Sequence, residues 1–203
     1  MCIDLPGHGL SDHYPRGMIY SVSDIFTVIL RIMDYFQWDK CSIIGHSLGG
    51  AIASYHTALF PDLVESLVSL DLATIPPLPL NKHVKSTRTS VKKSVEITDK
   101  MDNHPEPSYS FEEAVARAYM ANHIAHGEGS ISQRSVETIL ARNMKPSAGG
   151  DGLAWGVDLR LRIPSPFNIL EETAAEYASK IACPHLFIKV CYKFIWYFFS
   201  NYI

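Results

Sequence analysis

The sequence predicts an α/β fold in which crossover helices cover a parallel sheet, and three observations lead to this prediction. Short apolar, β-branched runs occupy 41–44 and 64–70, while helical patterns occupy 21–36 and 51–60. These segments alternate at short spacing, as consecutive strands and helices do in a parallel sheet. A further apolar run at 186–190 returns to the sheet after a long helical stretch.

The composition is that of one globular domain without a marked bias. The chain has 203 residues, of which 47% are hydrophobic and 19% are charged, and its formal net charge is -3. Such a charge offers no basic surface for nucleic acid. The cysteines form no C-x-x-C pair, so we expect buried free thiols in a reducing compartment and no metal site; they are Cys2, Cys41, Cys183 and Cys191.

The first elements follow from their boundary residues. Residues 3–6 look like the end of a strand that runs into the Gly-rich turn at 6–9. Ser21 or Ser23 can cap the helix at 21–36, in which apolar residues recur at helical spacing. We therefore expect a strand end, a turn and an amphipathic helix, in that order.

Two further strands surround the next helix. The apolar run at 41–44 predicts a short strand, and the helix at 51–60 ends at Pro61, because proline cannot continue a helix. The β-branched run at 64–70 predicts another strand, which Asp71 closes. Asp71 should therefore lie at the carboxyl end of that strand.

The second half of the chain is predicted to be largely helical. A Pro-rich stretch at 75–80 leads into a polar and basic segment at 81–100. Ser110 and Glu113 form a capping box that begins a helix at 110–124. The remaining expected elements are a helix at 132–142, a Gly-rich loop at 148–156, a helix at 171–180 and a strand at 186–190.

These elements divide the chain into three parts. We expect a core at 1–75, a helical insertion at 76–175, and a return to the core at 176–203. The last part contains the final strand and an aromatic tail, FIWYFFSNYI, at 194–203. This tail is too short to span a bilayer, which takes about 20 residues.

The motif Gly-His-Ser-Leu-Gly at 45–49 contains the candidate catalytic residues. A serine is a poor nucleophile unless it is exposed and oriented, and a G-x-S-x-G corner between a strand and a helix supplies both. Ser47 is therefore the candidate nucleophile, and the backbone N–H of Leu48 is the candidate oxyanion donor. We expect Gly45 and Gly49 to avoid collision between the strand and the helix.

The alternative is that Ser47 is a plain turn serine. The motif has an apolar strand before it and a helix after it, and the small residues Gly50 and Ala51 follow where that helix must pack closely. This context is the one that the nucleophile motif requires, so it favours the catalytic interpretation.

Two motifs together resemble a known family. Asp-Leu-Pro-Gly-His-Gly-Leu-Ser at 4–11, followed by Gly-His-Ser-Leu-Gly-Gly at 45–50, is similar to the α/β-hydrolase superfamily and most similar to its serine hydrolase-like (kraken-type) branch. The resemblance implies a partial α/β-hydrolase fold, with the fourth to sixth strands in 1–75 and a helical lid at 76–175. It also implies a serine hydrolase that acts on small ester-like or acyl substrates.

The family's acid and base are not evident in this sequence. The resemblance implies the order serine, acid, histidine. Asp71 is a weak candidate for the acid, since a strand-end turn or a helix cap explains it better. His8 and His46 favour structural roles, and His185 begins the last strand at the end away from the expected site. The histidines around the insertion favour surface or lid positions: His83, His104, His123 and His126.

Two other interpretations therefore stay open beside the hydrolase. One is a catalytically inactive truncated isoform or pseudoenzyme that lacks the triad histidine. The other is association with a membrane surface through the aromatic tail. Neither a cofactor signature nor a transmembrane segment is evident, and we expect no nucleic-acid partner. The cytoplasm is the expected location, with the perinuclear region or peroxisomes implied by the resemblance; substrate and oligomeric state stay unassigned.

Overall fold

The computed structural model describes residues 1–165 and 168–189. The chain divides into two compact units, each of which is described by itself. The sheet unit consists of Ser21–Val91 and of the described residues from Ser165 to Lys189. The helical unit consists of Met1–Tyr20 and Lys92–Pro164. The predicted aromatic tail at 194–203 lies outside the described residues.

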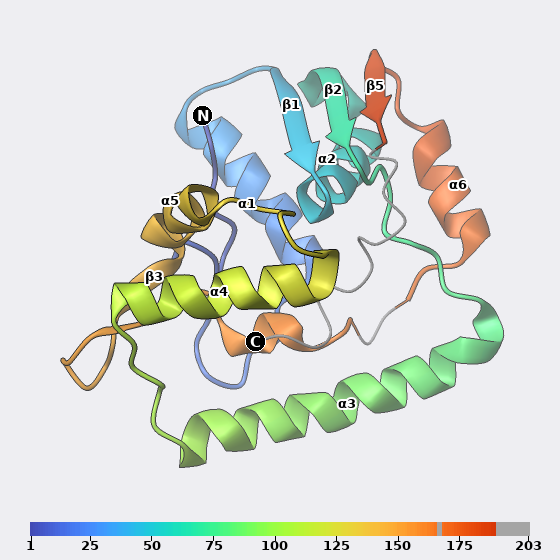
Figure 1. Cartoon of the computed structure of the whole chain (residues 1–203). Coiled ribbons are helices and arrows are strands. Elements are labelled where there is room, and N and C mark those ends of the chain that lie inside the picture. The colour runs from blue at the N-terminus through green and yellow to red at the C-terminus, as the bar shows by residue number, and fades with distance from the viewer. Residues whose placement is uncertain (166–167, 190–203) are drawn as a thin grey trace. The chain divides into compact units, whose positions relative to one another are not determined.

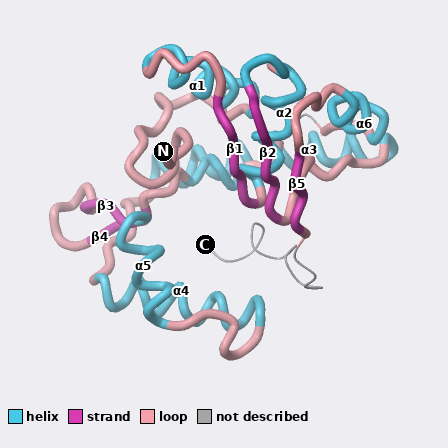
Figure 2. The backbone as a smooth tube through the Cα atoms, turned by 90° about the horizontal axis from the view of Figure 1, so that it is seen from above, coloured by secondary structure: helices cyan, strands magenta, loops and turns pink. Residues whose placement is uncertain are grey.

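A three-stranded parallel sheet forms the centre of the sheet unit. Its strands are β1 (Cys41–His46), β2 (Val64–Leu70) and β5 (His185–Ile188), in the order β1-β2-β5 (Figures 1 and 2). Leu67 of β2 is paired with Ile43 on one side and with His185 on the other. The predicted parallel sheet is confirmed, and the strand predicted at 64–70 has the expected bounds.

Three helices accompany this sheet: α1 (Val22–Tyr35), α2 (Leu48–Leu59) and α6 (Glu171–Ser179), with the short 3-10 helix Pro61–Leu63 before β2. The side chain of Ser21 caps α1 in a capping box with Asp24, as the sequence predicts for Ser21. The helix α2 packs on β1 and β2 and is buried over nine consecutive residues, 50–58. The core of the sheet unit lies along this helix.

The sequence analysis did not predict the helix α3 (Leu80–Asn103) as a separate element. The polar and basic segment at 81–100 forms most of it. No glycine or proline occurs between Leu80 and Asn103, so nothing interrupts the helical hydrogen bonds. This helix continues from the sheet unit into the helical unit.

Besides the last part of α3, the helical unit contains two helices, a hairpin and a 3-10 turn: α4 (Phe111–His126), α5 (Gln133–Asn143), β3 (Met144–Pro146), β4 (Leu153–Trp155) and the turn Leu159–Arg162. The strands β3 and β4 are antiparallel. The capping box of Ser110 and Glu113 begins α4 as predicted. The sequence analysis placed a Gly-rich loop at 148–156, but residues 153–155 of that range form the strand β4. Three residues are too short a run for a strand to be recognised in sequence.

A small apolar core holds α4 and α5 together. Ala114 and Val115 of α4 are buried against Val136 and Leu140 of α5. These residues recur at helical spacing on the two helices, so each helix presents one apolar face to the other. The helical unit therefore has a core of its own.

The strand end predicted at residues 3–6 is wrong. The carboxylate of Asp4 accepts the backbone N–H of Leu10, and the hydroxyl of Ser11 donates to the carbonyl of Asp4. A strand needs a hydrogen-bonded neighbour, whereas this segment is bonded to its own loop. The motif at 4–11 is consequently a closed turn in the helical unit.

Candidate active site

Ser47 occupies the corner between β1 and α2. Its backbone has φ 51° and ψ -120°, a conformation that L-residues rarely adopt. The corner is fixed on both sides, because the N–H of Ser47 donates to Leu70 at 2.9 Å and its carbonyl accepts the N–H of Ala51 at 3.1 Å. Backbone strain of this kind costs about 1–3 kcal/mol and is concentrated at functional sites.

The close approach of β1 and α2 requires glycine at two positions. A Cβ atom on Gly45 would lie 2.3 Å from the carbonyl oxygen of Gly49, and one on Gly50 would lie 2.3 Å from that of Leu72. A Cβ atom on Gly49 would have no neighbour within 4 Å. The steric requirement expected at Gly49 therefore falls on Gly50, because Gly49 contributes its backbone to the contact with Gly45 and points its own hydrogen away.

The helix α2 begins at Leu48, directly after Ser47. The first N–H groups of a helix have no partner within the helix, and the dipole makes this end slightly positive. The Leu48 N–H therefore belongs to a group of donors suited to an anionic oxygen. His46 is the last residue of β1 and is exposed.

Asp71 lies at the same edge of the sheet as Ser47. It follows the last residue of β2, Leu70, whose carbonyl accepts the Ser47 N–H. Asp71 is buried and has φ 73°, so it is a second non-glycine residue with a positive φ at this edge. Its own N–H donates to Ile188 of β5 at 2.7 Å. The structure thus brings the backbones of Ser47 and Asp71 to adjacent strand ends.

The candidate histidines have other partners. Nε2 of His185 lies 3.0 Å from the hydroxyl of Ser69. In the helical unit, Nδ1 of His8 lies 3.2 Å from the carbonyl oxygen of Pro6, which is the structural hydrogen bond expected for it. Nε2 of His83 lies 2.7 Å from the carbonyl oxygen of Leu78. The ring of His123 packs against that of Tyr119 within α4, with the centroids 4.0 Å apart and the ring planes tilted by 43°.

Two buried polar features were missed by the sequence analysis. The first is Asp158, whose carboxylate accepts hydrogen bonds from Arg160 at 2.7 Å and from Tyr20 at 2.9 Å. Nδ1 of His13 lies 3.3 Å from the same carboxylate. Burial opposes ionisation, but the hydrogen bonds from Arg160 and Tyr20 leave the pKa of Asp158 below its usual value. The only signal in sequence was an Asp-x-Arg spacing, which is too common to be informative.

The second missed feature is His56 in α2. Its ring is fully buried between Phe26 and Phe60, and neither ring nitrogen has a hydrogen-bond partner among the described residues. Desolvation lowers the pKa of His56 to about 4, so the ring is neutral at pH 7. A histidine in a helix of small apolar residues gives no sign of this environment in sequence.

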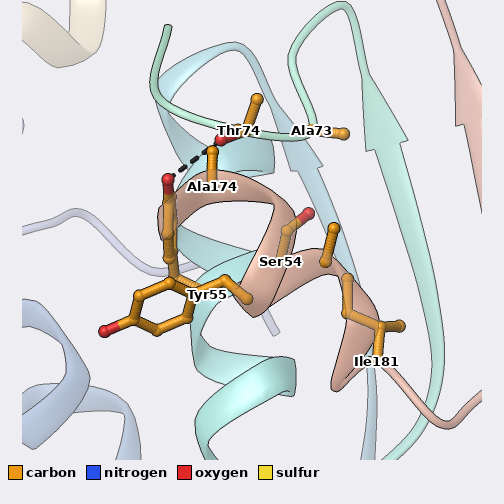
Figure 3. A pocket seen from close by; sticks show the side chains of 8 residues that line it. Ser54, Tyr55, Ala73, Thr74, Ala174 and Ile181 are labelled. Carbon is orange, nitrogen blue, oxygen red and sulfur yellow. Dashed lines mark hydrogen bonds between the residues drawn. The ribbon is translucent and has the colours of Figure 1, made fainter. Parts of the chain in front are cut away.

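The cavity beside α2 is too small for a substrate. It measures about 20 Å³ and lies between α2, the chain after β2, and α6 (Figure 3). The Tyr55 hydroxyl and Thr74 Oγ1 are 2.9 Å apart at its edge. Since a single water needs roughly 10–15 Å³ measured in this way, the cavity holds about one water. Among residues 1–165 and 168–189, no group of three or more His, Cys, Asp or Glu residues could hold a metal ion.

In an α/β hydrolase, the nucleophilic serine lies on a strained turn between a strand of the parallel sheet and the helix that follows it. The turn at Ser47 between β1 and α2 has this architecture. The chain belongs to the alpha/beta hydrolase fold family, whose model matches residues 1–107. The resemblance to the serine hydrolase-like branch of this superfamily is confirmed by the relatives described next.

Curated relatives match most of the chain. It is 31% identical over 190 residues to a protein named "Probable serine hydrolase" from Drosophila melanogaster, covering 93% of this chain and 56% of the relative. It is 32% identical over 150 residues to a serine hydrolase-like protein from Danio rerio, covering 74% of this chain and 44% of the relative. The chain spans about half the length of the curated relatives it matches.

Solved structures confirm the fold. A crystal structure of a hypothetical protein from Pseudomonas aeruginosa PAO1 has a TM-score of 0.77 and 23% sequence identity, covering 92% of this chain and 62% of that one. At this identity the likeness shows the fold alone. No described helix combines the length and the apolar character needed to cross a bilayer.

Proposed function

We propose that this chain carries the nucleophile of a serine hydrolase, with Ser47 as the nucleophile and the Leu48 N–H as an oxyanion donor. The observation that carries the proposal is the strained backbone of Ser47 at the junction of β1 and α2. A strained serine held by backbone hydrogen bonds to β2 and α2 is expected where the hydroxyl must be presented to a substrate. The names of the relatives support the same class of reaction.

The proposed reaction is acyl transfer. The Ser47 oxygen attacks the carbonyl carbon of an ester-like substrate, its proton passes to a general base, and the carbonyl oxygen becomes an oxyanion opposite the Leu48 N–H. The alcohol then leaves with a proton, and water releases the acid from the serine. Asp71, at the adjacent strand end, is the candidate for the residue that orients the base.

The ester class of substrate is supported by one relative in particular. The chain is 34% identical over 83 residues to a protein named as an esterase from Escherichia coli K12, covering 41% of this chain and 30% of the relative. Residues 1–75 and 176–203 would belong to the core in this proposal. Residues 76–175 would form the lid, which is consistent with their content of α3, α4 and α5.

The expected compartment is the cytoplasm. The expectation of buried thiols is wrong, because Cys2 is exposed and Cys41 and Cys183 are only partly buried. All three are free thiols, which persist in a reducing environment. Burial raises the pKa of Cys41, so this thiol is less reactive than an exposed one.

The proposal is tested by labelling the purified chain with a fluorophosphonate, which reacts only with an activated serine. We expect labelling of the unchanged chain and none of the Ser47→Ala variant. Ser42→Ala is the matched control, because Ser42 is an exposed serine of β1 that lies before the corner. Circular dichroism establishes that each sample is folded. A folded chain that takes no label contradicts the proposal and supports the inactive interpretation.

A further inference from the structure

The first half of α3 exposes its aliphatic residues. Leu80, Val84, Val91 and Val95 are each more than half exposed, and Val84 reaches 73%. At about 100° per residue, these positions fall within an arc of roughly 60° on one side of the helix. We call this set the α3 stripe.

The other side of the same helix carries small polar residues. Ser90 is buried, with 2% of its surface exposed, and the hydroxyl of Ser86 donates to the side chain of Asn168 at 3.4 Å. A helix on a protein surface normally turns its apolar residues inward and its polar residues outward. Over Leu80–Val95 the arrangement is reversed, so the α3 stripe is not explained by packing within the unit to which each of its residues belongs.

Positive charge flanks the α3 stripe on one side. Residues 80–95 contain Lys82, Lys85, Arg88, Lys92 and Lys93 and no aspartate or glutamate. Arg88 comes four residues after Val84 and three before Val91, and Lys92 comes three before Val95. Residues at these spacings are neighbours on a helix surface, so Arg88 and Lys92 lie directly beside the aliphatic side chains. Arg88 and Lys92 are both exposed.

We propose that the outward face of Leu80–Val95 binds an anionic lipid surface, with the helix lying in the plane of the interface. The aliphatic side chains would enter the boundary between headgroups and acyl chains, while Lys85, Arg88 and Lys92 would contact the anionic headgroups. Apolar burial and attraction to anionic lipid are the two contributions that bind such helices.

The charge also excludes a second copy of the chain as the occupant. A two-fold contact along the α3 stripe would bring the same set of cations from both copies together, with no acidic residue of the segment to offset them. Nucleic acid would use the cations and leave the aliphatic side chains in water. An anionic lipid surface can bind both the cations and the aliphatic side chains, because its negative charge lies beside an apolar layer.

The test measures co-sedimentation of the full chain with vesicles. One set contains phosphatidylcholine alone, and the other contains phosphatidylcholine mixed with phosphatidylserine. We expect binding to the mixed vesicles only, with binding that weakens as salt is added, because salt screens the attraction. Equal binding to both sets, or no binding to the mixed set, overturns the proposal without any variant being needed.

Three variants locate the binding surface. Lys85→Glu/Arg88→Glu/Lys92→Glu should lower the partition coefficient by ~10-fold or more, since each charge near such a surface contributes severalfold. Val84→Asn/Val91→Asn should also lower it. Arg31→Glu/Lys40→Glu/Arg134→Glu is the control with the same change in net charge, and it should bind like the unchanged chain.

The variants also separate α3 from the aromatic tail. All of them keep residues 194–203, so a membrane contact made by the tail would survive the substitutions in α3. Binding that is unaffected by both α3 variants, or equally reduced by the control, overturns the proposal. Fluorophosphonate labelling of the same samples reports on Ser47 independently, because the α3 stripe contains no residue assigned to the active site.

Discussion

Nε2 of His185 and Oγ of Ser69 lie 3.0 Å apart, and Ser69 Oγ lies 3.1 Å from Ser54 Oγ. One order of donors also satisfies the contact of Ser54 with Gly50. In this order the Ser54 hydroxyl donates to the carbonyl of Gly50, the Ser69 hydroxyl donates to Ser54, and Nε2 of His185 donates to Ser69. The ring of His185 is thus engaged with Ser69 and not with Ser47.

Removing the middle hydroxyl of this chain should destabilise the protein. Ser69 is fully buried, so Ser69→Ala leaves the Nε2–H of His185 without its acceptor. We expect the free energy of unfolding in urea to fall by about 1–3 kcal/mol. Ser66→Ala is the control, since Ser66 is a partly exposed residue of the same strand; an equal loss in both variants contradicts the buried chain of hydrogen bonds.

The buried ring of His56 should make stability depend on pH. Its pKa is about 4 in the folded chain against an ordinary value near 6.5, so between these values the unfolded chain binds more protons. The free energy of unfolding is therefore highest above pH 6.5 and falls by up to about 3 kcal/mol as the pH drops to 4. His56→Leu should remove this contribution, as seen by comparing urea unfolding of both chains across the range. Parallel pH profiles would show that His56 does not titrate as described.

Asp158 should hold the segment at 5–20 in place. Its carboxylate is bonded to Arg160 and Tyr20, and Arg160 in turn donates to the carbonyls of Pro15 and Met18. Asp158→Ala leaves a buried guanidinium unpaired, so we expect a loss of about 3–5 kcal/mol. Limited proteolysis should then cleave within the segment.

The control for this change is Asp151→Ala, because Asp151 is exposed in the same unit. It should leave both the stability and the cleavage pattern unchanged. A segment that stays protected in Asp158→Ala would show that other contacts hold it.

The glycines around Ser47 should respond differently to alanine. In Gly45→Ala the new Cβ would meet the backbone of Gly49 at 2.3 Å, so the chain must shift or fail to fold. In Gly49→Ala the Cβ meets nothing within 4 Å, and alanine is favoured over glycine in a helix by about 1 kcal/mol. Thermal unfolding should therefore rank Gly49→Ala at or above the unchanged chain and Gly45→Ala far below it. Equal effects would contradict the close approach of β1 and α2.

Relieving the strain at Ser47 should stabilise the chain while removing its reactivity. Glycine adopts a positive φ without cost, so Ser47→Gly should raise the free energy of unfolding by about 1 kcal/mol. The same variant should take no fluorophosphonate label. Ser42→Gly is the control in the extended part of β1, where glycine should lower stability. A destabilised Ser47→Gly would mean that the corner is not strained.

The sequence predicted best those elements whose ends are marked by local chemistry. The capping residues Ser21 and Ser110 begin α1 and α4 as expected, and β2 lies between Pro61 and Asp71 as expected. Capping and proline effects act within a few residues, so they can be identified in one sequence without knowledge of the fold.

Features that depend on distant residues could not be predicted. The aliphatic side chains of α3 face outward, so its pattern does not mark a buried face, and the helix went unrecognised. The pairing of His185 with Ser69 depends on the alignment of β5 beside β2, which nothing near His185 specifies. The contacts of Asp158 with Tyr20 likewise join residues far apart in sequence.

The order of the strands has a consequence for the nascent chain. β2 gains its neighbour β1 at once, because β1 precedes it with only α2 and a short 3-10 helix between them. Its other neighbour, β5, is synthesised only after α3, α4 and α5. Until then one edge of β2 exposes unpaired N–H and carbonyl groups to other chains. The sheet can therefore be completed only late in synthesis, and pairing between strands so far apart in sequence also slows folding. During translation the open edge of β2 should be accessible to chaperones.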